Sequence, residues 1–422
     1  MENKSQNFNH YNDFLYKELL NLPFDLNFII KKFIELNQKS RIAIVGGYPR
    51  DLIIQKIHKE KKLHTYDLDF VIEGSALSLA RFIKRNIKNV ELCLIKEFEL
   101  YNTVEMNINN IKVDIASARE EMYSSPGTNP KVKKSTIEND LKRRDFSINS
   151  IAFDFSKNEL IDLYGGINHI KKKELHLLHG NSICDDPSRL LRCAKYSSRL
   201  GFDISHDSLN QAQQIIAYWP WKTLNDKHVE KLPPGISIRL RMELFEIINN
   251  DNLGAVLSIL NDWKVTKLLD ESIKVDAKFL RGLSWIKRLK GKLILYLIKD
   301  SKSLEIICKR FFINTKERKI LIDFLNLRKN LNTRSKEFLD FSPLNWTKFI
   351  EEQNFDIETI KLIISEGGIF WKSFFRWLYV YRFIKSPKDG ETLKKEGWDP
   401  GKEMGKEIKR LRYLEIDKLN RN

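Results

Sequence analysis

The stretch Gly46-Gly47-Tyr48-Pro49-Arg50-Asp51, followed by Asp67-Leu68-Asp69-Phe70-Val71, carries most of the information about the fold. Residues 41–46 form a short, mainly apolar run ending in glycine, which predicts a buried strand. The two glycines allow a tight turn, and a helix is expected from there to about residue 58. A second strand is expected over residues 66–73. The order is therefore strand, glycine turn, helix and strand.

Asp67 and Asp69 lie two positions apart, so their side chains share one face of the predicted strand. Two neighbouring carboxylates repel each other unless a cation lies between them, and Mg²⁺ prefers oxygen ligands and phosphate partners. Metal ions held in this way activate a 3′-hydroxyl and neutralise a leaving pyrophosphate. A solvated edge strand is the alternative. The apolar residues that follow favour a buried strand, where bare paired acids are costly.

The glycine turn is the second candidate for chemistry. Gly47 lets a phosphate approach the backbone, the free N–H groups of a helix start attract anions, and Arg50 can add a charge-assisted bond to a triphosphate. An ordinary turn before a helix is the alternative reading.

Asp114, on a later predicted strand, is either a third carboxylate or a plain strand residue.

Two further motifs are rich in arginine and aspartate. Residues 140–150 contain Arg144, which can grip a phosphate, and Asp145, which can accept from sugar hydroxyls. In residues 185–196, Asp186 before a proline predicts a helix start. One face of that helix then carries Arg189, Arg192, Tyr196 and Arg199. An ordinary surface helix has the same spacing. In residues 160–166, Asp162 is expected to cap the next helix.

Taken together, residues 46–52, 67–69, 140–150 and 185–196 resemble the class II CCA-adding enzyme and bacterial poly(A) polymerase family. The resemblance implies a DNA polymerase β-like nucleotidyltransferase head. It implies that Asp67 and Asp69 are catalytic and hold Mg²⁺. It also implies that seven residues bind the nucleotide: Gly47, Arg50, Arg144, Asp186, Arg189, Arg192 and Lys195. Of these, Asp186 and Arg189 would read the base.

Three positions depart from the family pattern. Pro49 replaces the usual valine, Asp185 replaces the usual glutamate, and Lys195 stands where arginine is usual. Lysine keeps the charge but loses the planar fork of donors. Residues 117–134 correspond to a flexible loop of the family, but their composition is unusual. Residues 235–244 resemble a helix that steadies the base-reading helix, and residues 397–408 resemble the family's tail.

The predicted fold class is α+β: a head with a small mixed sheet and helices, then an all-helical neck, body and tail. The expected domains are an N-terminal arm and helix (1–40), the head (41–170), a helical neck that reads the base and binds RNA (171–250), and a body and tail that bind tRNA (251–422). Strands are expected over 91–117, with a turn at Asn109-Asn110. A mobile loop is expected over 121–136.

Composition is consistent with a polyanionic partner. The 422 residues include 73 Lys and Arg against 56 Asp and Glu, a net charge of +17. A lysine-rich proteome or an acidic membrane surface would give the same balance.

We find no signal peptide or membrane span, and we expect a cytoplasmic protein. The four cysteines form no CxxC pair, so no zinc site is expected. His206-Asp207 lacks the further ligands that a phosphohydrolase centre needs.

The function expected from these motifs is extension of the tRNA 3′ end without a nucleic-acid template. CTP or ATP would be consumed, pyrophosphate released, and CCA, only CC or only the final A added. Two alternatives remain. A bacterial poly(A) polymerase shares the head motifs. An RNA-binding protein derived from the family would be expected to have lost Asp67 or Asp69, and both are present. The sequence does not decide which nucleotides are added, whether a partner enzyme shares the task, or the oligomeric state.

Overall fold

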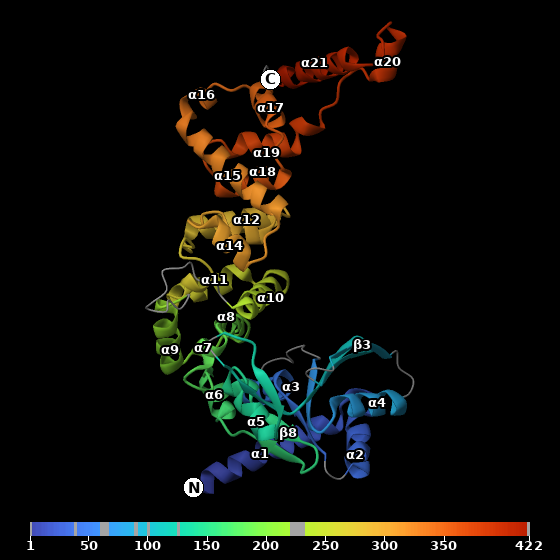
Figure 1. The fold of residues 1–422 in the computed structure, drawn as a ribbon, viewed down its shortest axis with the longest axis vertical. Helices are drawn as coiled ribbons and strands as arrows, with labels where there is room; N and C mark the ends of the chain where they lie inside the picture. The colour runs from blue at the N-terminus through green and yellow to red at the C-terminus, as the bar shows by residue number, and fades with distance from the viewer. Residues whose placement is uncertain are drawn as a thin grey trace. The chain divides into compact units, whose positions relative to one another are not determined.

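The computed structural model describes residues 2–37, 40–59, 67–87, 92–98, 102–124, 127–219 and 233–419. The chain divides into two compact units, Met1–Asn252 and Leu253–Asn422. The first unit combines a sheet with helices, and the described part of the second is helical (Figure 1). The α+β class predicted from the sequence is therefore confirmed.

A mixed sheet forms the centre of the first unit. Its strands are β1 (Arg41–Val45), β2 (Leu68–Glu73), β3 (Leu92–Phe98), β4 (Thr103–Ile108), β5 (Ile111–Ser117), β8 (Ala152–Asp154) and β9 (Glu159–Ile161). Within the described residues their order across the sheet is β3-β4-β5-β2-β1-β8-β9. The β2–β5 pair is parallel and the other pairs are antiparallel. Asn109 and Asn110 both have positive φ in the β4–β5 turn, as a two-residue hairpin requires.

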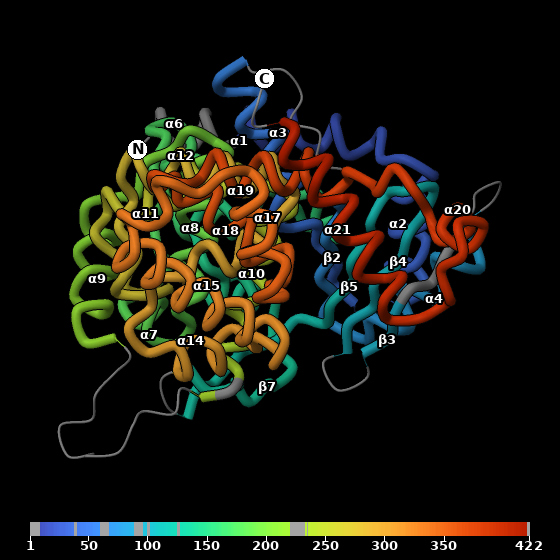
Figure 2. Tube along the Cα trace, turned by 90° about the horizontal axis from the view of Figure 1, so that it is seen from above, coloured from blue at the N-terminus to red at the C-terminus, as the bar shows by residue number. Residues whose placement is uncertain are grey.

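The helices of the head pack around this sheet. They are α1 (Glu2–Leu20), α2 (Leu26–Leu36), α3 (Gly47–His58), α4 (Ala76–Asn86), α5 (Ile137–Lys142) and α6 (Gly166–Lys172), with a 3-10 turn at Ser147–Asn149. In Figure 2, α4 lies beside β4 and β5, which it contacts, and α2 packs against α4 and β1. The arm expected at the N-terminus is mostly helical. As predicted, Asp162 accepts hydrogen bonds from the N–H groups of Gly166 (2.7 Å) and Ile167 (3.0 Å) at the start of α6.

One region of the head differs from the sequence-based expectation. Residues 121–136 were expected to be a loop, but β6 (Arg119–Met122) and β7 (Lys131–Lys134) pair as an antiparallel hairpin. Residues 125 and 126 near its tip lie outside the described residues. Lys133 lies 3.6 Å from Glu120 across the hairpin. This pairing of opposite charges offsets the low strand propensity of the segment.

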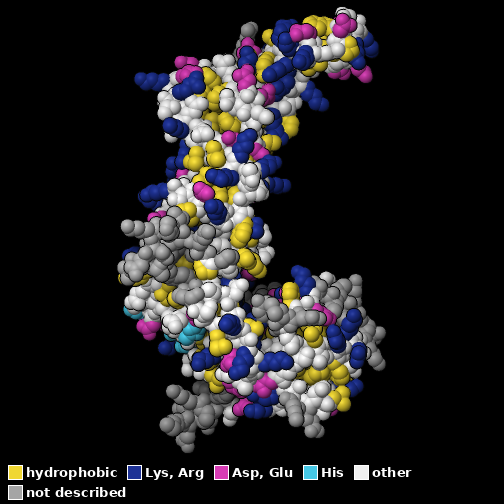
Figure 3. All heavy atoms as spheres, viewed as in Figure 1, with side chains coloured by type: hydrophobic (Ala, Val, Ile, Leu, Met, Phe, Trp, Pro, Cys, Tyr) yellow, Lys and Arg dark blue, Asp and Glu magenta, His cyan; other side chains and the backbone are white. Residues whose placement is uncertain are grey.

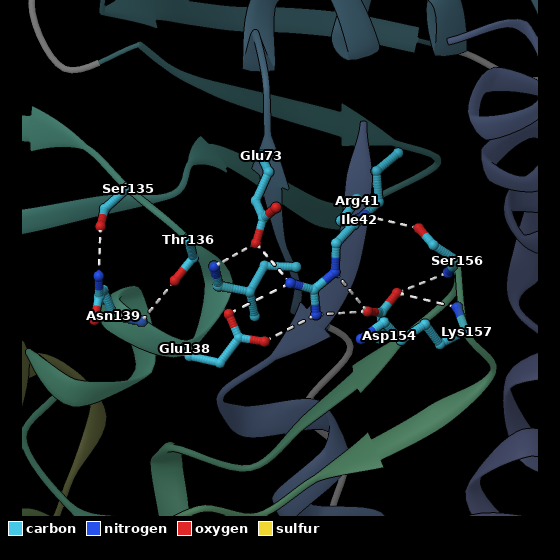
Figure 4. A network of polar contacts seen from close by, with 11 residues as sticks. Arg41, Ile42, Glu73, Ser135, Thr136, Glu138, Asn139, Asp154, Ser156 and Lys157 are labelled. Carbon is cyan, nitrogen blue, oxygen red and sulfur yellow. Dashed lines mark hydrogen bonds and ion pairs between the residues drawn. The ribbon is translucent and has the colours of Figure 1, made fainter. Parts of the chain in front are cut away.

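Arg41, at the start of β1, links four elements of the head (Figure 4). Its guanidinium bonds Glu73 at the end of β2 (2.9 Å), Glu138 in α5 (2.9 Å) and the fully buried Asp154 in β8 (2.9 Å). Glu73 also accepts the N–H of Ile137 (2.8 Å) at the first residue of α5. The network therefore fixes the position of α5, the helix that immediately precedes Arg143 and Arg144.

The rest of the first unit is largely helical. It contains β10 (Glu174–Leu175), α7 (Ser182–Asp185), α8 (Ser188–Leu200), β11 (Asp203–Ile204), α9 (His206–Ala217) and α10 (Pro234–Asn250). The predicted helix start at Asp186 is confirmed, because its Oδ1 accepts from the backbone N–H (3.1 Å) and the hydroxyl (2.7 Å) of Ser188. The predicted support of this helix by residues 235–244 is also confirmed, since α10 packs along α8.

Helices make up the described part of the second unit. They are α11 (Leu253–Asp262), α12 (Ala277–Arg288), α13 (Leu293–Ile298), α14 (Leu304–Arg310), α15 (Thr315–Thr333), α16 (Ser335–Leu339), α17 (Pro343–Glu352), α18 (Ile357–Glu366), α19 (Trp371–Tyr379), α20 (Gly390–Lys395) and α21 (Lys402–Lys418), with 3-10 turns η4 (Thr266–Leu268) and η5 (Tyr381–Phe383). Phe338 stacks on Trp346 in the core at 5.3 Å. Arg412 of α21 bonds both carboxylate oxygens of Glu351 in α17 (2.8 Å each). No helix among the described residues is long and apolar enough to cross a membrane.

Candidate active site

A cavity of about 720 Å³ lies in the first unit. Its wall is formed by the glycine turn after β1, by β2, β4 and β5, by the β6–β7 hairpin, by residues 143–145 and by α8 and α10. Four separate sequence motifs thus contribute residues to one cavity. The cavity contains Gly46, Gly47, Asp69, Arg144, Asp186, Arg189 and Arg192 in its wall.

Asp69 and Asp114 lie side by side on neighbouring strands. The parallel β2–β5 register pairs them directly, and the β1–β2 register places Val45, the residue before Gly46, opposite Asp69. Gly46 has φ of +75°, and a Cβ atom there would lie 3.0 Å from Asp69 Oδ2 and 3.3 Å from Arg144 Nη1. Glycine at this position therefore gives the carboxylate and the guanidinium room to approach the turn.

The carboxylates of this region lack full neutralisation. Burial raises the pKa of Asp69 and is the largest influence on it; Arg144 lowers the pKa, and Asp114 and Asp67 raise it further. Lys112 Nζ bonds Asp114 Oδ2 at 2.7 Å, while the buried Oδ1 has no hydrogen-bond partner in the described structure. Asp67 is exposed at the start of β2, outside the cavity wall. The site thus has oxygen atoms available for a cation.

Those oxygens fit a metal ion that also takes ligands from a substrate. Across the described ranges, no group of three or more His, Cys, Asp or Glu side chains is close enough to hold a metal by itself. Mg²⁺ usually keeps several waters and is held by one or two carboxylates together with substrate phosphates. Asp69, with the unpartnered oxygen of Asp114 beside it, meets that requirement.

Asp140 orients the two arginines that follow α5. This fully buried carboxylate accepts from Arg143 Nη2 at 2.7 Å and from Arg144 Nη2 at 3.3 Å. Burial alone would raise the pKa of Asp140, but Arg144 and Arg143 outweigh it and lower the pKa. A carboxylate that stays ionised in this way holds Arg144 near Asp69 and Gly46. The structure therefore places Arg144 beside Asp69 and Gly46 in the cavity wall.

Asp145 and Arg192 form an ion pair in the cavity wall. Arg192 Nη2 lies 2.8 Å from Asp145 Oδ2, and Asp145 Oδ1 accepts from Asn149 Nδ2 (3.0 Å) and the N–H of Phe146 (2.9 Å). Burial would raise the pKa of Asp145, but Arg192, Asn149 and other neighbours lower it. The pair joins the motif at residues 140–150 to α8.

Asp186 and Arg189 lie at the start of α8, with their orientation fixed by protein contacts. Arg189 donates to Ser182 Oγ (2.8 Å) and to the carbonyl oxygen of Arg143 (2.9 Å). Asp186 Oδ2 lies 3.2 Å from Arg239 Nε of α10. Both residues remain in the cavity wall. The Asp186 carboxylate is thus available as a hydrogen-bond acceptor, and the Arg189 guanidinium as a donor, in one cavity.

Sequence reasoning missed Arg239 and the hairpin residues that line the cavity. Arg239 also donates to Asn129 Oδ1 (3.1 Å) and to the Gly127 carbonyl oxygen (3.0 Å), so it connects the hairpin tip to Asp186. Tyr123 lines the cavity and donates to Glu121 Oε2 (3.0 Å). Burial and the adjacent Glu121 raise the pKa of Tyr123, so the phenol keeps its proton. The only local signal for these contacts was the Arg-x-Glu-x-Tyr run at 119–123.

Two predicted nucleotide-binding residues lie outside the cavity wall. Arg50 is buried and bonds Asp51 Oδ1 and Asn149 Oδ1, both at 2.7 Å. Lys195 is buried and contacts Glu243 (3.1 Å) and Glu246 (3.0 Å) of α10. Neither contributes to the cavity wall. In the structure Arg50 braces the turn, and Lys195 joins α8 to α10; the nucleotide contacts expected of them stay predictions.

Thiols and the His-Asp pair do not add a second site. Cys193 and Cys308 are buried, Cys184 is half-buried, and all three are unpaired, whereas the Cys93 side chain lies outside the described part of the chain. His206 and Asp207 are 84% and 100% exposed. The described chain thus concentrates its polar, buried chemistry around the cavity.

Comparisons with known proteins agree with this geometry. The family model for the poly(A) polymerase head domain matches residues 42–176. An A-adding tRNA nucleotidyltransferase of Aquifex aeolicus is 28% identical over 410 residues, covering 90% of this chain and 45% of that protein. A CC-adding tRNA nucleotidyltransferase of Deinococcus radiodurans is 30% identical over 187 residues, 42% of this chain and 46% of that protein. The chain thus spans less than half the length of these relatives.

Solved structures share the fold over nearly the whole chain. The Thermotoga maritima CCA-adding enzyme complexed with tRNA matches with a TM-score of 0.68 and 23% identity, covering 95% of this chain and 92% of that one. The motifs, the fold and these similarities agree: residues 42–176 match the poly(A) polymerase head domain, and the chain is similar in fold to the solved CCA-adding enzyme.

Proposed function

We propose that the chain is a tRNA nucleotidyltransferase that extends the tRNA 3′ end from CTP, ATP or both without a nucleic-acid template. The observation that carries the proposal is the convergence of two groups in one cavity. Asp69, Gly46 and Arg144 lie on one part of the wall, and Asp186 and Arg189 lie on another. The first group suits a triphosphate, and the second suits the polar edge of a base.

In this reaction an RNA 3′-hydroxyl attacks the α-phosphorus of the nucleotide, a new phosphodiester bond forms, and pyrophosphate leaves. Asp67 and Asp69 would hold Mg²⁺, with Asp114 as the third carboxylate, and the bound ion would activate the hydroxyl and neutralise the leaving group. Arg144, oriented by Asp140, contacts the phosphates. Gly46 and Gly47 let them approach the backbone at the start of α3.

Protein side chains must select the base, because the proposed reaction uses no template strand to pair with it. Asp186 can accept from an exocyclic amino group, and Arg189 can donate to ring or carbonyl acceptors. Cytosine and adenine both present an exocyclic amino donor beside a ring-nitrogen acceptor, whereas uracil and guanine present a carbonyl acceptor beside a ring N–H donor at the same places. Arg192, paired with Asp145, supports the same wall, and Arg239 connects Asp186 to the β6–β7 hairpin.

The test uses the full chain with Mg²⁺ and four tRNA substrates that end before CCA, after C, after CC and after CCA. Each is incubated with CTP, ATP or both, and the products are separated at single-nucleotide length. Two C and one A on the shortest substrate identify a CCA-adding enzyme. C additions that stop, or A added only after CC, identify a partial enzyme. A long ladder of A identifies a poly(A) polymerase, and no extension of any substrate contradicts the proposal.

A further inference from the structure

Positive charge alone does not locate an RNA surface on this protein. On the face shown in Figure 3, Lys and Arg side chains are spread over each unit and do not gather in one place. One segment of the second unit nevertheless has an unusual composition. Residues 367–385 contain eight aromatic residues and four Lys or Arg, and no Asp or Glu.

Four aromatic residues of this segment recur at every fourth position and form what we name the aromatic stripe: Trp371, Phe375, Tyr379 and Phe383. The first three follow one side of α19, and Phe383 ends η5. Ring centroids are 6.1 Å apart for Trp371 and Phe375, and 4.8 Å apart for Phe375 and Tyr379. Trp285 of α12 extends the stripe, 5.5 Å from Trp371.

Two rings of the stripe are exposed, while Phe374, Trp377 and Leu378 of α19 are buried. Tyr379 is 49% exposed and Phe383 is 61% exposed. Phe374 and Leu378, on the opposite side of α19, are buried in the core of the unit. Trp371 and Phe375 also contact Trp285 of α12, whereas the exposed rings of Tyr379 and Phe383 remain available to a ligand.

Cations lie directly beside the rings. Lys372 and Arg376 each follow a ring of the stripe by one position, and the guanidinium of Arg382 lies 4.6 Å from the centre of the Phe383 ring. Within the described residues none of these three cations has an acidic partner. Some other cations of the unit are paired, for example Arg412 with Glu351 and Lys292 with Glu317. The charge beside the stripe is therefore available to an anion.

We propose that the aromatic stripe stacks on unpaired bases of an RNA strand while Lys372, Arg376 and Arg382 contact its phosphates. The inference rests on the proposed function, which makes RNA the substrate. Base–aromatic stacking tolerates any sequence, and flanking cations track the backbone. From Trp371 to Tyr379 the helix rises about 12 Å, which is about the span of three or four stacked nucleotides.

Two features favour RNA over a membrane or a protein partner. A membrane-bound helix inserts its whole apolar face and keeps its cations on the other side. In α19 the main apolar face is already buried in protein, and the cations alternate with the exposed rings. A protein partner of ordinary composition would leave these unpaired cations uncompensated unless it were acidic.

The first experiment measures the affinity of the full chain for two labelled RNAs, without nucleoside triphosphate. One is a tRNA, and the other is a fully paired RNA duplex. Tyr379→Leu with Phe383→Leu keeps apolar bulk but removes the ring faces, and we expect the Kd for tRNA to rise about 10-fold. Tyr379→Phe with Phe383→Tyr should restore wild-type affinity. Phe28→Leu, at a 68% exposed aromatic residue of α2, is the matched control.

Affinity for the duplex should not change in the leucine variant, because paired bases offer no free faces along the strand. Equal loss on both RNAs, or unchanged affinity for tRNA, overturns the proposal. So does binding to phosphatidylserine vesicles that depends on the stripe while tRNA affinity does not. Because no nucleotide is added in this assay, its result is separable from failure of the proposed enzymatic activity.

The charges are tested by salt dependence. Arg376→Gln with Arg382→Gln should lower the slope of log Kd for tRNA against log salt by about 1.4, the value for two lost contacts to single-stranded phosphates. Lys309→Gln on α14, where the lysine is paired with Glu305 at 2.9 Å, should leave the slope unchanged. A slope unaltered by the double substitution excludes the phosphate contacts and contradicts the proposal.

Discussion

At the scale of single residues, Asp69 shows the conflict between stability and function. It is surrounded by protein on β2, has Asp114 directly beside it in register and feels Asp67 as well. An ionised carboxylate in such a place destabilises the fold until a cation or a proton neutralises it. Functional sites commonly retain strain of this kind.

Asp69→Asn should therefore separate activity from stability. We expect nucleotide addition to fall by at least about 1,000-fold, because a metal-binding oxygen is lost. The melting temperature without divalent cations should rise, because one of the neighbouring negative charges is removed. Asp207→Asn, a change at a fully exposed carboxylate, is the control for both measurements. An Asp69→Asn protein that still extends tRNA at the wild-type rate contradicts its catalytic assignment.

Lys195 provides the opposite case, a predicted nucleotide contact that holds two helices together. Lys195→Met should lower the free energy of unfolding by about 3 kcal/mol, because it leaves the largely buried Glu243 without its lysine. Adding Glu243→Gln should recover part of that loss. The ratio of CTP to ATP use should not change. An altered ratio with unchanged stability, in denaturant unfolding and single-turnover assays, shows that Lys195 acts on the nucleotide.

Arg50 and Lys195 show where sequence reasoning about single residues stops. The motif spacing correctly places Gly47, Asp69, Arg144, Asp186, Arg189 and Arg192 in one cavity wall. It does not show that Arg50 turns toward Asn149, 99 residues away, or that Lys195 turns toward Glu243. Which of several possible partners a long cationic side chain takes is decided by the fold.

At the scale of elements, the turn between β1 and α3 combines backbone conformation with clearance. Gly46→Ala should cost about 1 kcal/mol of folding free energy, because φ of +75° is strained for alanine. Its Cβ would also lie 3.0 Å from Asp69 Oδ2. Gly201→Ala has a similar φ of +64° but meets no atom within 4 Å. Both variants should lose similar stability in thermal melts, and only Gly46→Ala should lose most nucleotide addition. Equal activities would contradict a role for that clearance.

The Arg41 network at the start of α5 predicts a pH dependence of stability. The hydrogen bond from Arg41 lowers the pKa of Glu138 from 4.5 to about 2. The folded-state pKa is below the unfolded value, so this contribution to stability is complete above pH 4.5 and is lost as the pH falls toward 2. Wild type should therefore be more stable than Glu138→Gln at pH 6, by a margin that shrinks as the pH falls below 4.5. A margin that is constant with pH in urea unfolding would contradict the assignment.

Elements differ in how far sequence predicts them. The strands around residues 41–46 and 66–73 and the helix between them are signalled by apolar runs and glycines, and the structure confirms them. The β6–β7 hairpin is not signalled, because its Ser, Pro, Gly and Lys composition favours a loop. Arg239, 110 residues from Asn129, holds its tip. A contact so distant in sequence cannot be predicted from local pattern.

At the scale of the whole molecule, the proposals assign nucleotide addition to the first unit and part of RNA binding to the second. The first contains the cavity with its carboxylates and with Asp186 and Arg189, and the second presents the aromatic stripe with its neighbouring cations. With a net charge of +17, affinity for RNA should fall steeply with salt. Selection of the nucleotide should depend less on salt, because hydrogen bonds within a cavity are less screened than surface charges.

The central claim is that the cavity of the first unit selects the nucleotide by protein contacts alone. The most direct measurement is the rate of single-nucleotide addition to tRNA from each of CTP, ATP, UTP and GTP, by wild type and by Asp186→Asn. Asparagine preserves the cap on Ser188 but removes the charge facing Arg239. We predict that wild type uses CTP, ATP or both and rejects UTP and GTP, and that Asp186→Asn reduces this discrimination by about 10-fold or more. Discrimination unchanged by the substitution, or absent from the wild type, would contradict the claim.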